Sequence, residues 1–290
     1  MPRVPAARVT RKKPKLGQHF LSDRTAAARI VDELGDVSQR TVLEIGPGQG
    51  AITSLLAKRT RRLIGIELDR VLAAQLRMKF ALYPNVEIIE ADILAVDFDG
   101  LFAPKPGSMR PGLNHDPERV QAVGNLPYFI TSDILLRLFE YRRYFETLLL
   151  MVQREVAERL AAEPGNSEYG LLTATAQLYS DVENVFTLPP GAFSPPPKVH
   201  SSVVRLKMDS RLEKLQVPEE EFIAFLKLAF GQKRKTLWNN LKSDYENRKL
   251  RAAMEQSGVS SNARAEELGV EKSAALFREL TKSSAVLVRN

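Results

Sequence analysis

Residues 41–51 read TVLEIGPGQGA, a short apolar run followed at once by a glycine-rich turn. A run of this kind is typical of a buried parallel strand. The glycines let the backbone turn tightly and let a ligand approach the next helix N-terminus without a Cβ in the way. The turn also fits G-x-G-x-x-[GA], and Glu67 lies about twenty residues further on, where a carboxylate can hydrogen-bond ribose hydroxyls. This stretch predicts a strand, a turn and a helix that together bind a nucleotide-like group.

The alternation of apolar runs and helical periodicity continues as far as residue 152. Strands are expected at residues 41–45, 63–67, 86–90, 120–124 and 147–152, and helices at 51–59, 69–80 and 131–139. Repeated strand–helix–strand units predict an α/β fold with a parallel, doubly wound sheet. Ligands of such sheets bind outside the carboxyl ends of the strands.

The rest of the chain combines a Pro-rich connection with mostly helical sequence. Residues 99–119 carry four prolines and three glycines, and a loop of this length is usually either functional or disordered, which the sequence leaves open. Helices are expected at 151–160, at 169–179 and throughout from Pro218, and a strand at 202–208. The change near 210–218 predicts three parts, namely a basic flexible arm (1–15), an α/β domain (16–210) and a small all-α C-terminal domain (211–290).

Basic residues are concentrated in two places. The chain has 42 Lys+Arg against 35 Asp+Glu, a formal net charge of +7, and residues 1–15 hold six basic residues and no acid. A second acid-free basic run covers residues 231–242. Such runs are commonly solvated tails or faces, and they are also typical of proteins that bind polyanions. Charge alone leaves both interpretations open.

The sequence argues against several classes of site. There is no cysteine, and His19, His115 and His200 are far apart in sequence, so no disulfide, thiolate or metal site is expected. The longest apolar run, residues 148–152, is far shorter than the roughly 20 residues that cross a bilayer. We therefore expect a cytoplasmic protein without a metal or a membrane partner, and nothing calls for more than a monomer.

Two features separate the enzyme classes that share such a glycine turn, nicotinamide-dependent dehydrogenases and class I methyltransferases. Asp92 follows the third strand, where it can accept a hydrogen bond from an adenine amino group, although an acid at a strand end is also a common cap or turn residue. The fourth strand ends in the tetrapeptide Asn125-Leu126-Pro127-Tyr128. This tetrapeptide favours transfer of a group to an amino nitrogen.

The tetrapeptide suits the chemistry of an exocyclic adenine amino group, whose lone pair is delocalised into the ring. Acceptors in front of its two hydrogens draw the nitrogen towards tetrahedral geometry. The side-chain oxygen of Asn125 and the carbonyl of Leu126 can supply two acceptors, and Pro127 removes a competing donor. The ring of Tyr128 can stack on a base that has left its helix or loop. The proton leaves after attack, so no general base is required.

Longer segments carry a resemblance to a known family. They are KLGQHFL from residue 15, EIGPGQGAIT from 44, GIELD from 65, EADIL from 90, GNLPYFITS from 124, MVQREVAERL from 151, FSPPPKVHS from 193 and FGQKRKTLWNNL from 230. The chain resembles the small-subunit rRNA adenine dimethyltransferases, the KsgA/RsmA family, which modify two adjacent adenosines near the 3′ end of 16S rRNA. The resemblance implies a class I (Rossmann-like) methyltransferase sheet with S-adenosylmethionine as methyl donor and 16S rRNA, within a 30S precursor, as partner.

The resemblance also implies roles for individual residues. Tyr128 and Phe193 would sandwich the target base, although Phe193 also fits a buried anchor in a Pro-rich loop. The residues that would contact the methyl donor are His19, Leu21, Gly46, Gly48, Glu67, Asp92 and Asn125. The resemblance also places the helical C-terminal part against rRNA. From their positive charge, the residues expected to contact rRNA are Arg11, Lys12, Lys13, Lys198, Lys233, Arg234 and Lys235.

Two departures and three rival functions remain. Many family members have a polar residue after the tetrapeptide, where this chain has Phe129, and the stretch at 99–119 looks longer than usual. An Erm-like methyltransferase acting on 23S rRNA shares the glycine turn and the tetrapeptide. A non-catalytic ribosome assembly factor could retain the same fold. A dehydrogenase is disfavoured by the tetrapeptide.

Overall fold

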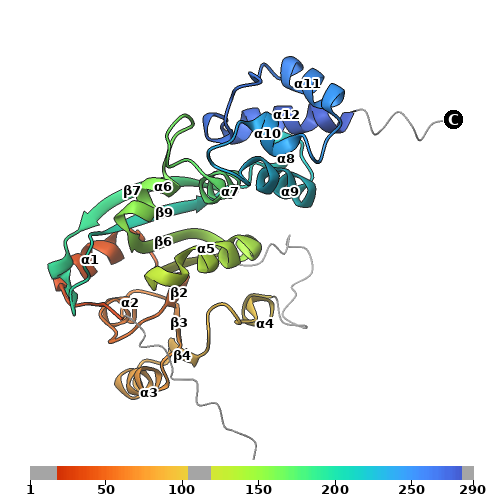
Figure 1. Cartoon of the computed structure of the whole chain (residues 1–290). Helices are drawn as coiled ribbons and strands as arrows, with labels where there is room; N and C mark the ends of the chain where they lie inside the picture. Colours follow the sequence, from red (N-terminus) through yellow and green to blue (C-terminus); the bar gives the residue numbers. More distant parts are fainter. Residues whose placement is uncertain (1–17, 104–118, 283–290) are drawn as a thin grey trace, which may run out of the picture.

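The computed structural model describes residues 18–103 and 119–282 (Figure 1). Seven strands form one sheet in the order β4-β3-β2-β5-β6-β9-β7. They are β2 (Thr41–Ile45), β3 (Arg62–Glu67), β4 (Val86–Glu90), β5 (Val120–Asn125), β6 (Phe145–Gln153), β7 (Ser180–Leu188) and β9 (Ser201–Met208). A separate ribbon pairs β1 (Phe20–Leu21) antiparallel with β8 (Phe193–Ser194).

Five strands form the parallel part that the sequence predicts. β2 pairs with β3 and β5, β3 pairs with β4, and β5 pairs with β6, all in parallel. The strands expected at 41–45 and 86–90 have the observed bounds, and the other three are one to three residues longer. Every residue of β2 is buried, as expected for a strand covered on both faces. The α/β fold class is confirmed.

The sheet is not parallel throughout, so that part of the expectation is wrong. β9 pairs antiparallel with both β6 and β7. The connection between β7 and β9 contains no α-helix to return the chain across the sheet, and antiparallel neighbours need none. Exposed residues recur along β7, which is typical of a half-solvated edge strand. Because β7 lacks a continuous apolar run, the sequence pattern does not predict a strand there.

The helices of the α/β part are α1 (Arg24–Asp32), α2 (Thr53–Leu56), α3 (Arg70–Lys79), α4 (Phe98–Phe102), α5 (Thr131–Glu140), α6 (Arg154–Leu160) and α7 (Leu171–Tyr179). The bounds of α3 follow from its cap, because the Asp69 carboxylate accepts hydrogen bonds from the first-turn N–H groups of Val71 and Leu72. α2 is shorter than the expected 51–59. The hydroxyls of Ser54 and Thr60 bond back to backbone carbonyls there, a pattern that competes with helix.

Two other expectations are corrected along this part of the chain. The helix expected from Met151 begins only at Arg154, because Met151 and Val152 still pair with β9 as part of β6. The connection expected at 99–119 starts with α4, which the buried Phe98 anchors in the core. The prolines between residues 104 and 118 lie outside the described residues.

The C-terminal part is helical, as expected. Its helices are α8 (Leu212–Leu215), α9 (Glu219–Ala229), α10 (Leu237–Leu241), α11 (Asn247–Gln256) and α12 (Val270–Lys282), which gather at one end of the molecule (Figure 1). The rings of Phe222, Phe225 and Phe277 pack together. One hydrophobic cluster joins these helices to the sheet. The domain division near 210–218 therefore stays a prediction, since buried side chains are shared across it.

The central strands come closest just before the tetrapeptide. Gly124 pairs with Ile45 across β5 and β2. A Cβ on Gly124 would lie 2.7 Å from the backbone oxygen of Ile45. Since backbone atoms of a central strand cannot move aside cheaply, only glycine allows this approach, and the approach positions Asn125 beside the glycine turn.

Substitution Gly124→Ala is expected to push β5 away from β2 and to cost about 1–3 kcal/mol of the free energy of unfolding, as overpacking does. Urea unfolding followed by circular dichroism measures this cost. Gly191→Ala is the matched control, because nothing lies within 4 Å of a Cβ at Gly191. Equal midpoints for the two variants would contradict the close-packing argument.

Candidate functional site

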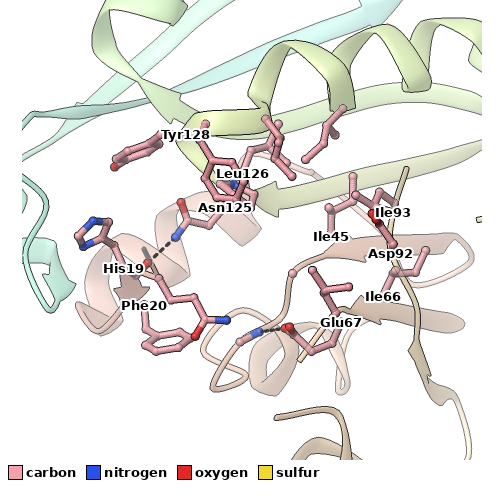
Figure 2. Close-up of a pocket in the computed structure, with 18 of the residues that line it drawn as sticks. His19, Phe20, Ile45, Ile66, Glu67, Asp92, Ile93, Asn125, Leu126 and Tyr128 are labelled. Atoms are coloured by element: carbon pink, nitrogen blue, oxygen red, sulfur yellow. Dashed lines mark hydrogen bonds between the residues drawn. The ribbon is translucent and has the colours of Figure 1, made fainter. Parts of the chain in front are cut away.

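An open cavity lies at the carboxyl ends of β2, β3, β4 and β5 (Figure 2). This is where open α/β sheets bind their ligands. Segments that are far apart in sequence line it. The lining residues are Gln18, His19, Phe20, Ile45, Gly46, Gly48, Ile66, Glu67, Leu68, Ala91, Asp92, Ile93, Asn125, Leu126, Pro127, Tyr128, Phe129, Ile130 and Ile134.

The glycine turn is held to the end of β3 through Glu67. The Gly48 N–H donates to Glu67 Oε2 at 2.9 Å, as the dashed line in Figure 2 shows, and the Asp69 N–H donates to Oε1 at 2.9 Å. A Cβ on Gly48 would lie 2.8 Å from the Phe20 ring, and the backbone of Gly48 has a φ of 58°, which favours glycine. Each carboxylate oxygen of Glu67 keeps lone-pair capacity for a ligand.

Asn125 joins the tetrapeptide to the N-terminal segment. Its Nδ2 donates to the carbonyl oxygen of His19 at 2.8 Å (Figure 2). The backbone N–H of Leu126 donates to the carbonyl of Met151 in β6 at 3.0 Å. The first bond orients the side-chain amide of Asn125, and the second holds the backbone of the tetrapeptide against β6.

The ring of Tyr128 is anchored at its hydroxyl and stacked at its face. Its hydroxyl shares a hydrogen bond of 2.7 Å with Ser201 Oγ at the start of β9, and burial raises the pKa of the Tyr128 phenol. The His19 ring stacks at a centroid distance of 5.9 Å and an angle of 27°. His19 Nδ1 lies 2.7 Å from the carbonyl oxygen of Pro195 and donates to it. The N-terminal segment and the 190s loop thus meet beside Tyr128.

Asp92 follows β4 and lines the cavity with an exposed side chain. Its Oδ1 accepts from the Leu94 N–H at 2.9 Å. The turn role and a ligand role are therefore compatible, since Oδ2 is left for the ligand.

Two residues assigned to the site in sequence do not line this cavity. Phe193 is only 3% exposed and packs in a hydrophobic cluster with Leu21, which is also its partner in the β1–β8 ribbon. In the described structure His19, and not Phe193, is the ring against Tyr128. The sandwich of Tyr128 and Phe193 around a base stays a prediction. Leu21 lines a smaller neighbouring cavity with Gly46 and Asn125.

Four of the seven basic residues assigned to RNA lie in the described part of the chain, and they are outside this cavity. Lys198 is exposed near the start of α6, beside Arg154 and His200. Lys233, Arg234 and Lys235 are exposed in the turn between α9 and α10. Arg11, Lys12 and Lys13 lie outside the described residues. RNA contact at all of these positions stays a prediction.

The part of the chain that the structure describes contains neither a candidate metal site nor a candidate membrane span. Within residues 18–103 and 119–282, no three His, Asp or Glu side chains are grouped so that they could hold a metal ion. Over the same residues no helix is both long and apolar enough to cross a membrane.

Glu44 is a buried acid beside the site that the sequence analysis passed over. It is 2% exposed and lines the smaller cavity with Gly46 and Asn125. Burial raises the pKa of its carboxyl to about 7, and the nearby Thr53 offsets only part of this effect. The sequence did contain a signal for Glu44, because it is an acid inside the mostly apolar run at 41–45.

The raised pKa of Glu44 predicts a pH-dependent stability. Between its ordinary value of 4.5 and about 7, the folded protein keeps a proton that the unfolded chain releases. The free energy of unfolding therefore falls as pH rises through this window, by up to about 3 kcal/mol. Substitution Glu44→Gln removes that contribution. The melting temperature of the variant should therefore exceed that of the wild type at pH 8 and equal it near pH 4.5. If the melting temperatures of the two proteins differed by the same amount at every pH, the buried Glu44 carboxyl would not be the origin of the pH dependence.

Three proteins of known identity show what the chain is similar to. It is 55% identical over 284 residues, or 97% of this chain and 100% of the relative, to "Ribosomal RNA small subunit methyltransferase A" from Koribacter versatilis. The crystal structure of the 23S rRNA methyltransferase ErmE matches with a TM-score of 0.66 and 29% identity, over 90% of this chain and 99% of that one. A dimethyladenosine transferase from Plasmodium falciparum matches in fold with a TM-score of 0.73 and 24% identity, over 92% of this chain and 98% of that one.

The family comparison covers almost the whole chain. The family described as "Ribosomal RNA adenine dimethylase" matches residues 9–282. Together with the full-length relative, this match agrees with the cavity at the strand ends and with the tetrapeptide that borders it. The chain belongs to the ribosomal RNA adenine dimethylase family.

Proposed function

We propose that this protein transfers methyl groups from S-adenosylmethionine to the N6 amino groups of two adjacent adenosines near the 3′ end of 16S rRNA. The observation that carries the proposal is the tetrapeptide at residues 125–128, which borders the same cavity as the glycine turn and the acids of β3 and β4. The protein would act as a monomer on a precursor of the 30S subunit in the cytoplasm. Its product would be N6,N6-dimethyladenosine.

The lining of the cavity suits the methyl donor. Glu67 is oriented by two backbone N–H groups and can accept from ribose hydroxyls, and Asp92 can accept from the adenine amino group. The apolar Leu68 and Ile93 offer surfaces for the adenine ring. Gly46 leaves space that a side chain would fill, whereas at Gly48 the Phe20 ring already occupies that space. The bound donor supplies a methyl group on a sulfonium, which needs no activation by an acid.

The tetrapeptide suits the acceptor. The oxygen of Asn125 and the carbonyl of Leu126 would accept the two N6 hydrogens, so that the nitrogen lone pair points at the methyl carbon. The new N–C bond forms as the C–S bond breaks, and a proton then leaves the positively charged nitrogen for water. Tyr128 would hold the base by stacking, with its ring fixed through Ser201. Orientation of this kind can contribute roughly 7–11 kcal/mol to lowering a barrier.

The decisive measurement gives labelled S-adenosylmethionine to undermethylated 30S particles and to free 23S rRNA, with mass spectrometry of both products. We expect label in two adjacent adenosines of 16S rRNA. Asn125→Ala should lower the turnover number by at least about 100-fold, as the loss of one site hydrogen-bonding group can. Asn184→Ala, on exposed β7, is the matched control and should keep full activity.

Other outcomes of this assay identify the rival functions. Label in 23S rRNA alone would indicate an Erm-like enzyme. Binding of 30S particles without transfer by the wild-type protein would indicate a non-catalytic assembly factor. Full activity of Asn125→Ala would contradict the role given to the tetrapeptide.

RNA binding should depend steeply on salt if the basic turn contacts phosphates. Neutralising Lys233, Arg234 and Lys235 together, each to Gln, should reduce the slope of log affinity against log salt by about 2, or roughly 0.7 for each single-strand phosphate. Filter binding to 30S particles across a salt series measures the slope. The same series on a chain lacking residues 1–13 tests the N-terminal basic run.

A matched control removes the same net charge elsewhere. Lys58, Lys214 and Lys272 are exposed and scattered over the molecule, and their joint change to Gln should leave the slope nearly unchanged. If both triple variants reduce the slope equally, the effect is one of net charge and the turn is an ordinary solvated face.

A further inference from the structure

Phe129 is an exposed aromatic residue at the edge of the cavity. It lies in the short 3-10 turn at Tyr128–Ile130, between β5 and α5, and it lines the cavity. Its exposed fraction is 66%. Apolar burial stabilises a fold in proportion to the area removed from water, so this ring contributes little to stability where it is.

The turn that carries Phe129 is held by its neighbours. Tyr128 is anchored through Ser201, and Thr131 Oγ1 donates to the carbonyl of Pro127 at 3.1 Å. Ile134 of α5 is completely buried beneath the turn. Across the described residues, the Phe129 ring has no stacked aromatic partner and no cation over its face. The side chain is therefore available to a ligand.

The methyl donor and the RNA are the two candidates for that ligand. A side chain that encloses the donor should lie inside the cavity, as the buried Ile93 and Ile134 do. Phe129 instead faces solvent directly next to Tyr128, the residue expected to hold the target base. The RNA strand continues on both sides of that base, so a neighbouring base can reach this edge of the cavity.

We propose that Phe129 is a stacking platform for the nucleobase adjacent to the target adenine, so that the site holds two consecutive nucleotides on two consecutive aromatic residues. This inference rests on the proposed function and deepens it. A phenyl ring offers a π face to any base, and it therefore contributes affinity for the strand without reading its sequence. Because the RNA strand has a direction, a platform on one side of the pocket takes the neighbour on one side only, so one of the two adjacent target adenosines would occupy it while the other is in the pocket.

The test compares Phe129→Ala, Phe129→Trp and Leu136→Ala in steady-state methylation of undermethylated 30S particles, with donor affinity measured separately by calorimetry. Leu136 lies on α5 and is 48% exposed, so Leu136→Ala is a matched loss of exposed apolar surface and should behave as the wild type. We expect Phe129→Ala to raise the KM for the particle about tenfold, in line with alanine substitution of stacking residues. The turnover number and the donor Kd should stay within about twofold of the wild type, and Phe129→Trp should restore the KM.

Several results would overturn the platform. They are an unchanged KM for Phe129→Ala, a weakened donor Kd of the same size, or a fall confined to the turnover number. In each of these cases the wild type and Leu136→Ala would still methylate 30S particles. If the wild type itself is inactive on these particles, the proposed function fails instead, so the two failures are distinguishable.

Discussion

The parallel register of β2 with its two neighbours is the constraint on which the site depends. Ile45 is level with Ile66 of β3 and with Gly124 of β5, so the next residue of each strand lies at the same edge. Those residues are Gly46, Glu67 and Asn125. The glycine turn, an acid and an amide are thereby brought together by backbone hydrogen bonds alone, before any side chain contacts another. A slip of one residue in either ladder would turn each side chain to the opposite face of the sheet.

A second layer of contacts joins the chain's early residues to this edge. The hydrogen bond from Asn125 to the His19 carbonyl and the pairing of β1 with β8 both cross more than a hundred residues of sequence. The amide that would orient the acceptor nitrogen is thus also the attachment point of the segment that lies over the donor side. In the proposed function, this one side chain would couple the binding of the donor to that of the acceptor.

Much of this arrangement could be predicted, because much of it is local. The buried strands, the cap at Asp69, the glycine turn and the tetrapeptide each depend on a few neighbouring residues. Strand β7 could not be read in the same way, since its apolar pattern is broken by exposed residues. The strand expected at 202–208 is observed as β9, but its local sequence does not show that it pairs antiparallel. The surroundings of Tyr128 could not be predicted either, since its partners His19 and Ser201 come from distant segments. The burial of Phe193 agrees with the buried anchor that the sequence allowed, but its pairing in the β1–β8 ribbon could not be predicted, because the ribbon pairs only two residues on each side, too few to leave a periodic signal.

Strand β9 fixes the distance between the surroundings of Tyr128 and the C-terminal helices. It begins at Ser201, which anchors Tyr128, and it ends at Met208, after which the chain enters the C-terminal helices. Eight residues in extended form span about 26 Å, and β9 is held on both sides by β6 and β7, so this span cannot stretch. β9 therefore fixes the separation between Ser201, which contacts Tyr128, and the start of the C-terminal helices. In the proposed function, an RNA that contacts both places would have to present its adenosines at that separation from its second contact, so the shape of the RNA would select the target.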